Sequence, residues 1–198
     1  MITLASSVEA LGAPAQGRSI SPVSVRAILR ETTLNDHDLI DQAMSKLDLT
    51  DRVDYGTFLA VHHEALMTLA EHWSARDQSD FLGLLACLAD DLRALNLPCD
   101  HSSATHSAGA ECLDQWGLAY VIRGSRLGGA ILRRRVPAGY PTSFLDYEPA
   151  LTWPRFLQQL ECTVQAMSAQ VRAQIVRGAK QAFAAFFAAA ANSGLTHE

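Results

Sequence analysis

The sequence predicts an all-α protein, a single-domain bundle of several helices. Apolar residues recur every three or four positions in six segments, which is the period of an amphipathic helix. No segment alternates apolar and polar residues over enough positions to indicate a strand. The 198 residues suffice for one domain with a full hydrophobic core and are too few for two domains of ordinary size.

The helices are expected in six segments separated by breaks. The first begins at Ser21 and Pro22, a capping residue followed by a proline at the first helical position, and its apolar stripe continues to Leu47. The third ends before Pro98 and is followed by a loop. Prolines make the stretch before the fifth helix irregular. The predicted helices span about 21–47, 55–73, 79–95, 111–135, 153–167 and 169–191, with the loop at 99–110 and the irregular stretch at 136–150.

The helical domain is expected to span residues 21–191, between a flexible N-terminal tail at 1–20 and a short C-terminal tail at 192–198. The N-terminal tail is rich in Ala, Gly, Ser and Pro and has no basic residue before its short apolar patch, so it does not resemble a secretory signal. No apolar run approaches the roughly 20 residues that span a bilayer. The sequence therefore predicts no membrane association.

Charge and cysteine content narrow the possible functions. The net charge of −5 and the pI of about 5.8 argue against binding to nucleic acid, which usually needs a positive field. The four cysteines are scattered and form no Cys-x-x-Cys pair, so neither a zinc site nor a disulfide scaffold is indicated. Cys87, Cys99, Cys112 and Cys162 are interpreted as small buried hydrophobic residues of a protein in a reducing cytoplasm.

His37 is the first residue that requires an explanation. It lies four residues after Thr33 and three before Ile40, so helical spacing places it on the core-facing stripe of the first helix. It is either a core residue hydrogen-bonded to a neighbour or the axial ligand of a large planar metal cofactor, a role in which a second partner holds the imidazole tautomer. A second metal site is not favoured, because His63 and His72 lack the i, i+4 spacing of a helical metal pair.

The second feature is a cluster of glycines in the predicted fourth helix. Gly124, Gly128 and Gly129 lie within six residues, and each glycine inside a helix destabilises it by about 0.8–1.0 kcal/mol relative to alanine. Gly124 and Gly128 share one helix face and leave a bare strip of backbone there. The strip serves either the close approach of a flat ligand, with bending of the helix, or tight packing against another helix.

Three motifs occur in order along the chain. The segment 29–37 reads Leu-Arg-Glu-Thr-Thr-Leu-Asn-Asp-His, with a basic residue seven positions before the histidine. The segment 124–129 reads Gly-Ser-Arg-Leu-Gly-Gly, and 179–183 reads Ala-Lys-Gln-Ala-Phe. Together they resemble the proximal helix, the kinked distal helix and the closing helix of the haem oxygenases, a family with an all-α fold. The resemblance extends from about Ser24 to Phe187.

The resemblance implies roles for individual residues. His37 would be the iron ligand on the proximal side of haem, and Arg30 would pair with a haem propionate through a charge-assisted hydrogen bond. Arg155 lies where the family often keeps a second propionate-binding base. The next expected base, one turn later, is Gln159 here.

On the distal side, the resemblance implies that Gly124 and Gly128 bring the helix backbone close to iron-bound dioxygen. Many members carry an aspartate directly after the first glycine, which organises the waters that deliver protons. This chain has Ser125, so the expected catalytic residues are Gly124, Ser125 and Gly128, with an ordered water supplying the proton. The remaining residues expected to line the haem pocket are Thr33, Tyr120, Gly129 and Phe183.

The implied activity is the oxidative cleavage of haem to biliverdin, carbon monoxide and ferrous iron, with O2 and electrons from a ferredoxin or a reductase. The pattern is most similar to bacterial members that supply bilin to bacteriophytochromes, so a redox donor protein and a bacteriophytochrome are the expected partners. Ser125 and Gln159 also leave open a carrier or sensor that binds haem or a bilin without degrading it. An unrelated helical interaction domain is the third interpretation.

Overall fold

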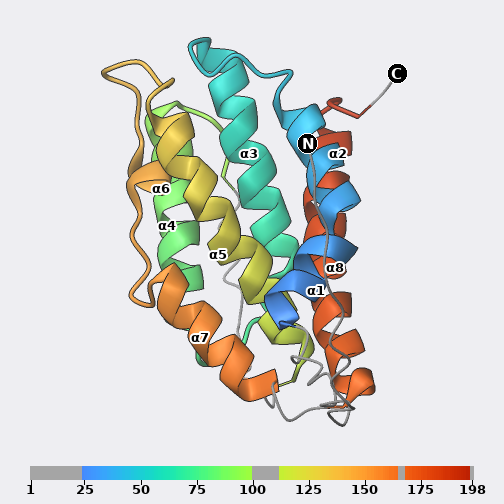
Figure 1. The fold of residues 1–198 in the computed structure, drawn as a ribbon. Helices are drawn as coiled ribbons and strands as arrows, with labels where there is room; N and C mark the ends of the chain where they lie inside the picture. Colours follow the sequence, from blue (N-terminus) through green and yellow to red (C-terminus); the bar gives the residue numbers. More distant parts are fainter. Residues whose placement is uncertain (1–23, 100–111, 165–167, 197–198) are drawn as a thin grey trace, which may run out of the picture.

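The computed structural model describes residues 24–99, 112–164 and 168–196. These residues form helices and connecting loops without a strand, so the predicted all-α class is confirmed (Figure 1). Within these ranges, no helix has the length and apolar character that a bilayer crossing requires. The elements are α1 (Val25–Thr32), α2 (Leu34–Met44), α3 (Arg52–Thr68), the 3₁₀ turn η1 (Ala70–His72), α4 (Gln78–Ala94), α5 (Asp114–Arg133), α6 (Ser143–Asp146), α7 (Trp153–Val164) and α8 (Ala169–Asn192).

The packing centres on α8, which contacts α1, α2, α3 and α5. Its contact with α5 is a backbone-to-backbone approach through two glycines. A Cβ atom on Gly117 would lie 1.9 Å from the carbonyl oxygen of Ile175, and one on Gly178 would lie 1.8 Å from the carbonyl oxygen of Asp114. Only glycine permits helices this close. Buried alanines along α8, such as Ala182, continue the close contact surface.

The expected first helix is broken at Thr33, which has φ −112° and ψ 7° and separates α1 from α2. The prediction of one continuous helix over 21–47 is therefore wrong, and its proposed start at Ser21 lies outside the described residues. Two adjacent threonines account for the break. The hydroxyl of Thr32 donates to the carbonyl of Ile28, and that of Thr33 donates to the carbonyl of Leu29. Such bonds to the preceding turn weaken and bend helices.

Carboxylates fix several helix starts. The Asp51 side chain accepts hydrogen bonds from the backbone N–H groups of Val53 and Asp54 at the start of α3. The buried Asp91 of α4 accepts from the N–H groups of Ser143 and Phe144, both at 2.9 Å. This contact produces the short helix α6 inside the stretch 136–150, which was expected to be irregular throughout.

The N-terminus of α1 is capped by a residue distant in sequence. The carboxylate of Glu161, on α7, accepts hydrogen bonds from the Ser24 hydroxyl and from the backbone N–H groups of Val25 and Arg26. Partial burial raises the pKa of Glu161, but the hydrogen bonds from Ser24, Arg26 and Val25 outweigh it and bring the pKa below its ordinary value of 4.5. Glu161 thus satisfies the unpaired donors of α1 and joins α1 to α7.

The cysteine interpretation is wrong for two of the four residues. Cys112 and Cys162 are exposed, whereas Cys87 and Cys99 are half-buried. Cys162 lies on the outer face of α7, whose inner face is formed by Phe156, Leu160 and Val164.

Replacement of Gly178 by alanine is expected to destabilise the protein by about 1–3 kcal/mol, because the added methyl group collides with the backbone of α5. Gly128→Ala is the matched control. Its Cβ has no neighbour within 4 Å, and alanine is expected to stabilise α5 by up to about 1 kcal/mol. Urea unfolding followed by circular dichroism measures both, and equal effects of the two substitutions would contradict the packing described here.

Replacement of Glu161 by glutamine is expected to destabilise the protein by about 0.5–2 kcal/mol at pH 7, the range for a lost helix cap. Because folding lowers the pKa of Glu161, its stabilisation is present above pH 4.5 and is lost as the pH falls through the folded-state value. The difference in unfolding free energy between wild type and variant should therefore shrink in acid. Glu71→Gln, on exposed η1, is the control. A difference that stays constant with pH would refute this role of Glu161.

Candidate functional site

His37 lies on α2 with its side chain 59% exposed, so the expectation that it belongs to the core-facing stripe is wrong. The break at Thr33 ends that stripe, and the buried residue of α2 is Ala43. The imidazole Nδ1 lies 3.1 Å from a carboxylate oxygen of Asp41, one turn later. The ring also packs edge-on against Phe183 of α8, with centroids 6.1 Å apart. Asp41 can hold Nδ1 protonated, which directs the lone pair of Nε2 outward.

The role of a core histidine hydrogen-bonded to a neighbour, one of the two expected for His37, is filled by His62. Its ring contacts the rings of Phe58, Phe144 and Phe186, and its Nδ1 lies 2.8 Å from the carbonyl oxygen of Phe58. Burial lowers the pKa of His62 to about 4, so the ring is neutral at pH 7. The two histidines therefore differ in kind: His62 is a packing residue, and His37 presents an accessible nitrogen.

Helix packing is the role of Gly117 of α5 and of Gly178 of α8, and it is not the role of Gly128, which lies further along α5. A Cβ on Gly128 would meet no atom within 4 Å, and one on Gly124 would meet only the ring of Trp153, at 3.5 Å. Of the two interpretations of the glycine cluster, close helix packing is thus excluded at Gly128, whereas Gly124 packs against Trp153 of α7. Gly128 is exposed and leaves accessible backbone, and Gly124 is half-buried beside the Trp153 ring.

Large apolar side chains are exposed next to these residues. Leu34 lies one turn before His37 on α2, Leu127 and Ile131 lie one turn after the two glycines on α5, and Phe187 lies one turn after Phe183 on α8. Ile131 is 67% exposed. Exposed apolar side chains of this kind can contribute to a binding surface where they lie side by side. An accessible imidazole, bare backbone and exposed apolar side chains are the kinds of group that hold an iron porphyrin, so the chemistry of these residues fits haem.

Tyr120 lies where α5 meets α7. Tyr120 of α5 packs against Trp153 of α7, with ring centroids 5.4 Å apart, and Trp153 also covers Gly124. Burial raises the pKa of the Tyr120 phenol, and the positive charges of Arg26 and Arg30 on α1 oppose that rise.

The other predicted residues are placed as follows. Arg30, Arg155 and Gln159 have exposed side chains, the last two on α7. Thr33 is buried, with its hydroxyl bound to Leu29. Gly129 is buried, and the guanidinium of Arg126 lies 3.6 Å from the position of its Cβ.

The Ser125 hydroxyl is engaged within its own helix. It donates to the carbonyl of Ile122 at 2.9 Å. A serine hydroxyl with this partner keeps its oxygen as an acceptor for one further donor, such as a water molecule. Ser125 can thus order a water molecule, but it supplies no acidic proton of its own.

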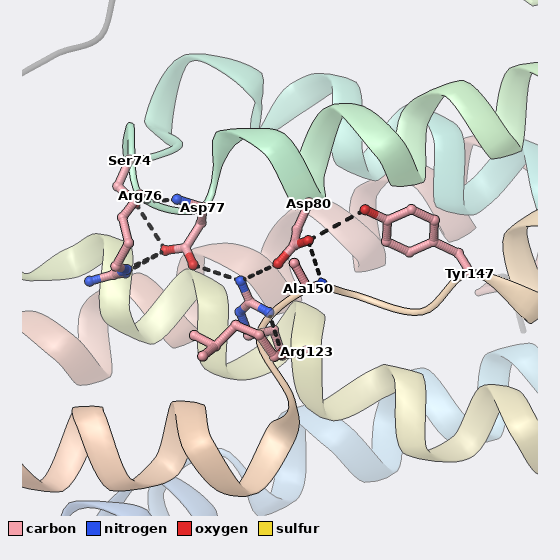
Figure 2. A network of polar contacts seen from close by, with 8 residues as sticks. Ser74, Arg76, Asp77, Asp80, Arg123, Tyr147 and Ala150 are labelled. Carbon is pink, nitrogen blue, oxygen red and sulfur yellow. Dashed lines mark hydrogen bonds and ion pairs between the residues drawn. The ribbon is translucent and has the colours of Figure 1, made fainter.

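Behind the glycine face, α5 is held by a buried polar network. Figure 2 shows the Arg123 guanidinium between the carboxylates of Asp77 and Asp80, at 2.8 and 2.7 Å. Arg123 also donates to the carbonyl of Leu151 at 3.0 Å. Burial by itself raises the pKa of Asp77, but Arg76 and Arg123 outweigh burial and hold it below its ordinary value. Asp80 in turn accepts from the backbone N–H of Ala150 at 2.9 Å.

Comparison with known proteins identifies the family. The chain is 34% identical over 155 residues to "Heme oxygenase" of Xanthomonas campestris pv. campestris (strain 8004), which covers 69% of this chain and 88% of that protein. The chain therefore belongs to the heme oxygenase family, and the predicted resemblance is confirmed. A scan against protein-family models gives no match.

Comparison with solved structures supports the fold. The NO- and CO-bound heme oxygenase from Neisseria meningitidis is similar, with a TM-score of 0.61 and 17% sequence identity. The likeness covers 86% of this chain and 92% of that chain. At this identity the likeness shows that the two proteins share an all-α fold.

Sequence reasoning missed three residues of this region. Asp41 carried a usable signal, because a carboxylate four residues after a histidine lies on the same helix face. Arg123, directly before the first glycine, gave no sign of being buried, since arginines are usually exposed. Trp153 lies on α7, about 30 residues after Gly124 in the chain, and no sequence pattern predicts a contact between the two residues.

Proposed function

We propose that this protein is a haem oxygenase that cleaves haem to biliverdin, carbon monoxide and ferrous iron, using O2 and electrons from a ferredoxin or a reductase. The single observation that carries the proposal is the accessible His37 imidazole, oriented by Asp41 and flanked by exposed apolar residues, in a chain of the heme oxygenase family. When bound, haem supplies the iron that activates dioxygen and the porphyrin that is oxidised.

The protein's own contribution is binding and orientation. His37 would hold the iron through Nε2, while Asp41 keeps the proton on Nδ1 and increases the basicity of the ligand. Phe183 fixes the imidazole from the side and would pack against the macrocycle. Arg30 and Arg155 would pair with the propionates, with Gln159 as a weaker neutral partner. Thr33, Tyr120 and Gly129 would complete the surroundings of the macrocycle.

On the opposite side, Gly124 and Gly128 would let the backbone of α5 approach the oxygen-binding position. No side chain at these two residues competes for that space. Ser125 would hold a water molecule through its hydroxyl oxygen, and that water would supply the proton. The network of Arg123 with Asp77 and Asp80 keeps α5 in place from behind.

A carrier or sensor function is the second candidate, favoured by Ser125, whose hydroxyl is bound to its own helix and provides no acid. One experiment separates the two. The purified protein is reconstituted with haemin and given a reductant system in air with catalase present. Formation of biliverdin supports the oxygenase, whereas a stable dioxygen complex supports the carrier.

A bacteriophytochrome as acceptor of the product is part of the proposal and is tested by transfer of the bilin to such a protein.

Replacement of His37 by alanine is expected to abolish the Soret and visible spectrum of histidine-ligated haem, because the only proposed iron ligand is removed. Added imidazole should restore the spectrum by occupying the space left by the side chain. His72→Ala, at another exposed histidine, is the control and should leave the spectrum unchanged. Unchanged spectra and turnover in the His37 variant would show that the ligand assignment is wrong.

Replacement of Gly128 by leucine is expected to lower the rate of biliverdin formation at least about tenfold, which corresponds to about 1.4 kcal/mol in the barrier. The larger side chain occupies the space over the α5 backbone and keeps dioxygen out. Ferric haem should still bind, as measured by titration of its Soret band, because His37 is unaffected. Turnover at the wild-type rate would contradict the distal role of this face.

A further inference from the structure

A small, partly open cavity lies behind α5, on the side away from Gly124 and Gly128. It offers about 10 Å³ to the centre of a water molecule. Its walls come from η1 and its flanks, from α4 and α5, and from the segment before α7. Its polar lining residues are Trp73, Asp77, Asp80, Arg123 and Arg126, and the rest of the lining is apolar: Phe81, Leu84, Ile122 and Pro149. The space is enough for one water molecule and too little for an organic ligand.

Two N–H groups of the lining residues have no hydrogen-bond acceptor among the described residues: Nε1 of Trp73 and Nε of Arg126. Trp73 is 7% exposed, and the Arg126 guanidinium is enclosed by the carbonyls of Phe144, Leu145 and Tyr147, to which its Nη2 donates. A buried donor without an acceptor costs about the desolvation free energy of the group. Buried donors of native proteins are therefore normally paired, often with ordered water.

The same cavity has unused acceptors. Asp77 Oδ1 and Asp80 Oδ2 each accept one hydrogen bond, from Arg123, in the described structure. A carboxylate oxygen can accept two. The four side chains that carry these two donors and two oxygens therefore all line one cavity of one-water size.

We propose that this cavity holds one internal water molecule, which accepts hydrogen bonds from Trp73 and Arg126 and donates to the carboxylates of Asp77 and Asp80. A water molecule has the two lone pairs and two protons that this set of partners requires. A halide would satisfy the two donors, but it would face both carboxylates without a proton to offer them. The two carboxylates in the lining therefore favour water over an anion.

The bound water has a structural consequence that is independent of haem. It extends the polar network of Figure 2 from Arg123 to Arg126, one turn further along α5. Gly124 and Ser125 lie between these two arginines. The water would therefore connect both arginines behind the glycine face to α4 and to Trp73.

The test uses the indole N–H signals of the full-length, 15N-labelled chain, which has three tryptophans. Trp73→Phe assigns the Trp73 signal, and the half-exposed Trp116 and Trp153 serve as internal references. Magnetisation is transferred selectively from water in the laboratory frame and in the rotating frame. A bound water near Trp73 gives cross-peaks of opposite sign in the two experiments, whereas exchange of the indole proton with solvent gives the same sign.

Opposite signs at Trp73, unchanged when chloride is replaced by gluconate, would support the internal water. Absence of a cross-peak would mean a dry cavity, and equal signs would mean direct solvent access, so either result overturns the proposal. A Trp73 shift that titrates with chloride would overturn it in favour of an anion. All these outcomes are read on the purified chain without haem, so they do not depend on the proposed oxygenase activity.

Discussion

The approach of the α5 backbone to the α8 backbone at Gly117 and Gly178 is the constraint from which the arrangement of the site follows. With each glycine facing a carbonyl of the other helix, the two helices have no freedom to slide or separate at this point. Helix α2 packs on the same helix α8, through Phe183 and through the ion pair of Lys180 with Asp36 at 3.5 Å. Helix α8 therefore sets the position of His37 relative to the glycine face of α5.

One side of α5 carries glycines and exposed apolar residues, and the opposite side carries two arginines in polar contacts. The contacts of the arginines hold the helix in place, so that the glycine side can remain bare. On the outer side, glycines and exposed apolar residues contribute little to stability, and each glycine costs about 0.8–1.0 kcal/mol relative to alanine. On the inner side, Arg123 and Arg126 make charge-assisted hydrogen bonds to carboxylates and to backbone carbonyls, which are among the strongest in proteins. A helix held from behind in this way can present bare backbone without losing its position.

The sequence was sufficient for the class of fold, because helical period is a local property, and for the family, because the three motifs that carry the resemblance are short and local. It was not sufficient for the orientation of His37. The hydroxyls of Thr32 and Thr33 bond to the preceding turn and end α1 at Thr33, although the apolar period continues past this point. Hydrophobic periodicity contains no information about such hydrogen bonds, so it predicted one continuous helix. The packing glycines Gly117 and Gly178 could not be distinguished from Gly124 and Gly128 either. What a glycine faces depends on a partner helix far away in the chain.

The break at Thr33 also divides the candidate site into two parts, of which both pack on α8 and only the first is joined to α7. Helix α1, which carries Arg30, is attached to α7 by the carboxylate of Glu161. Helix α2, which carries His37, is attached to α8 near Phe183 and, beyond its end, by the Lys46 ammonium, which donates to the carbonyl of Leu195. A continuous helix would transmit any shift at its first turn to the imidazole. With the break, in the proposed function, a propionate-binding arginine can adjust with α1 and α7 while the iron ligand stays fixed on α8.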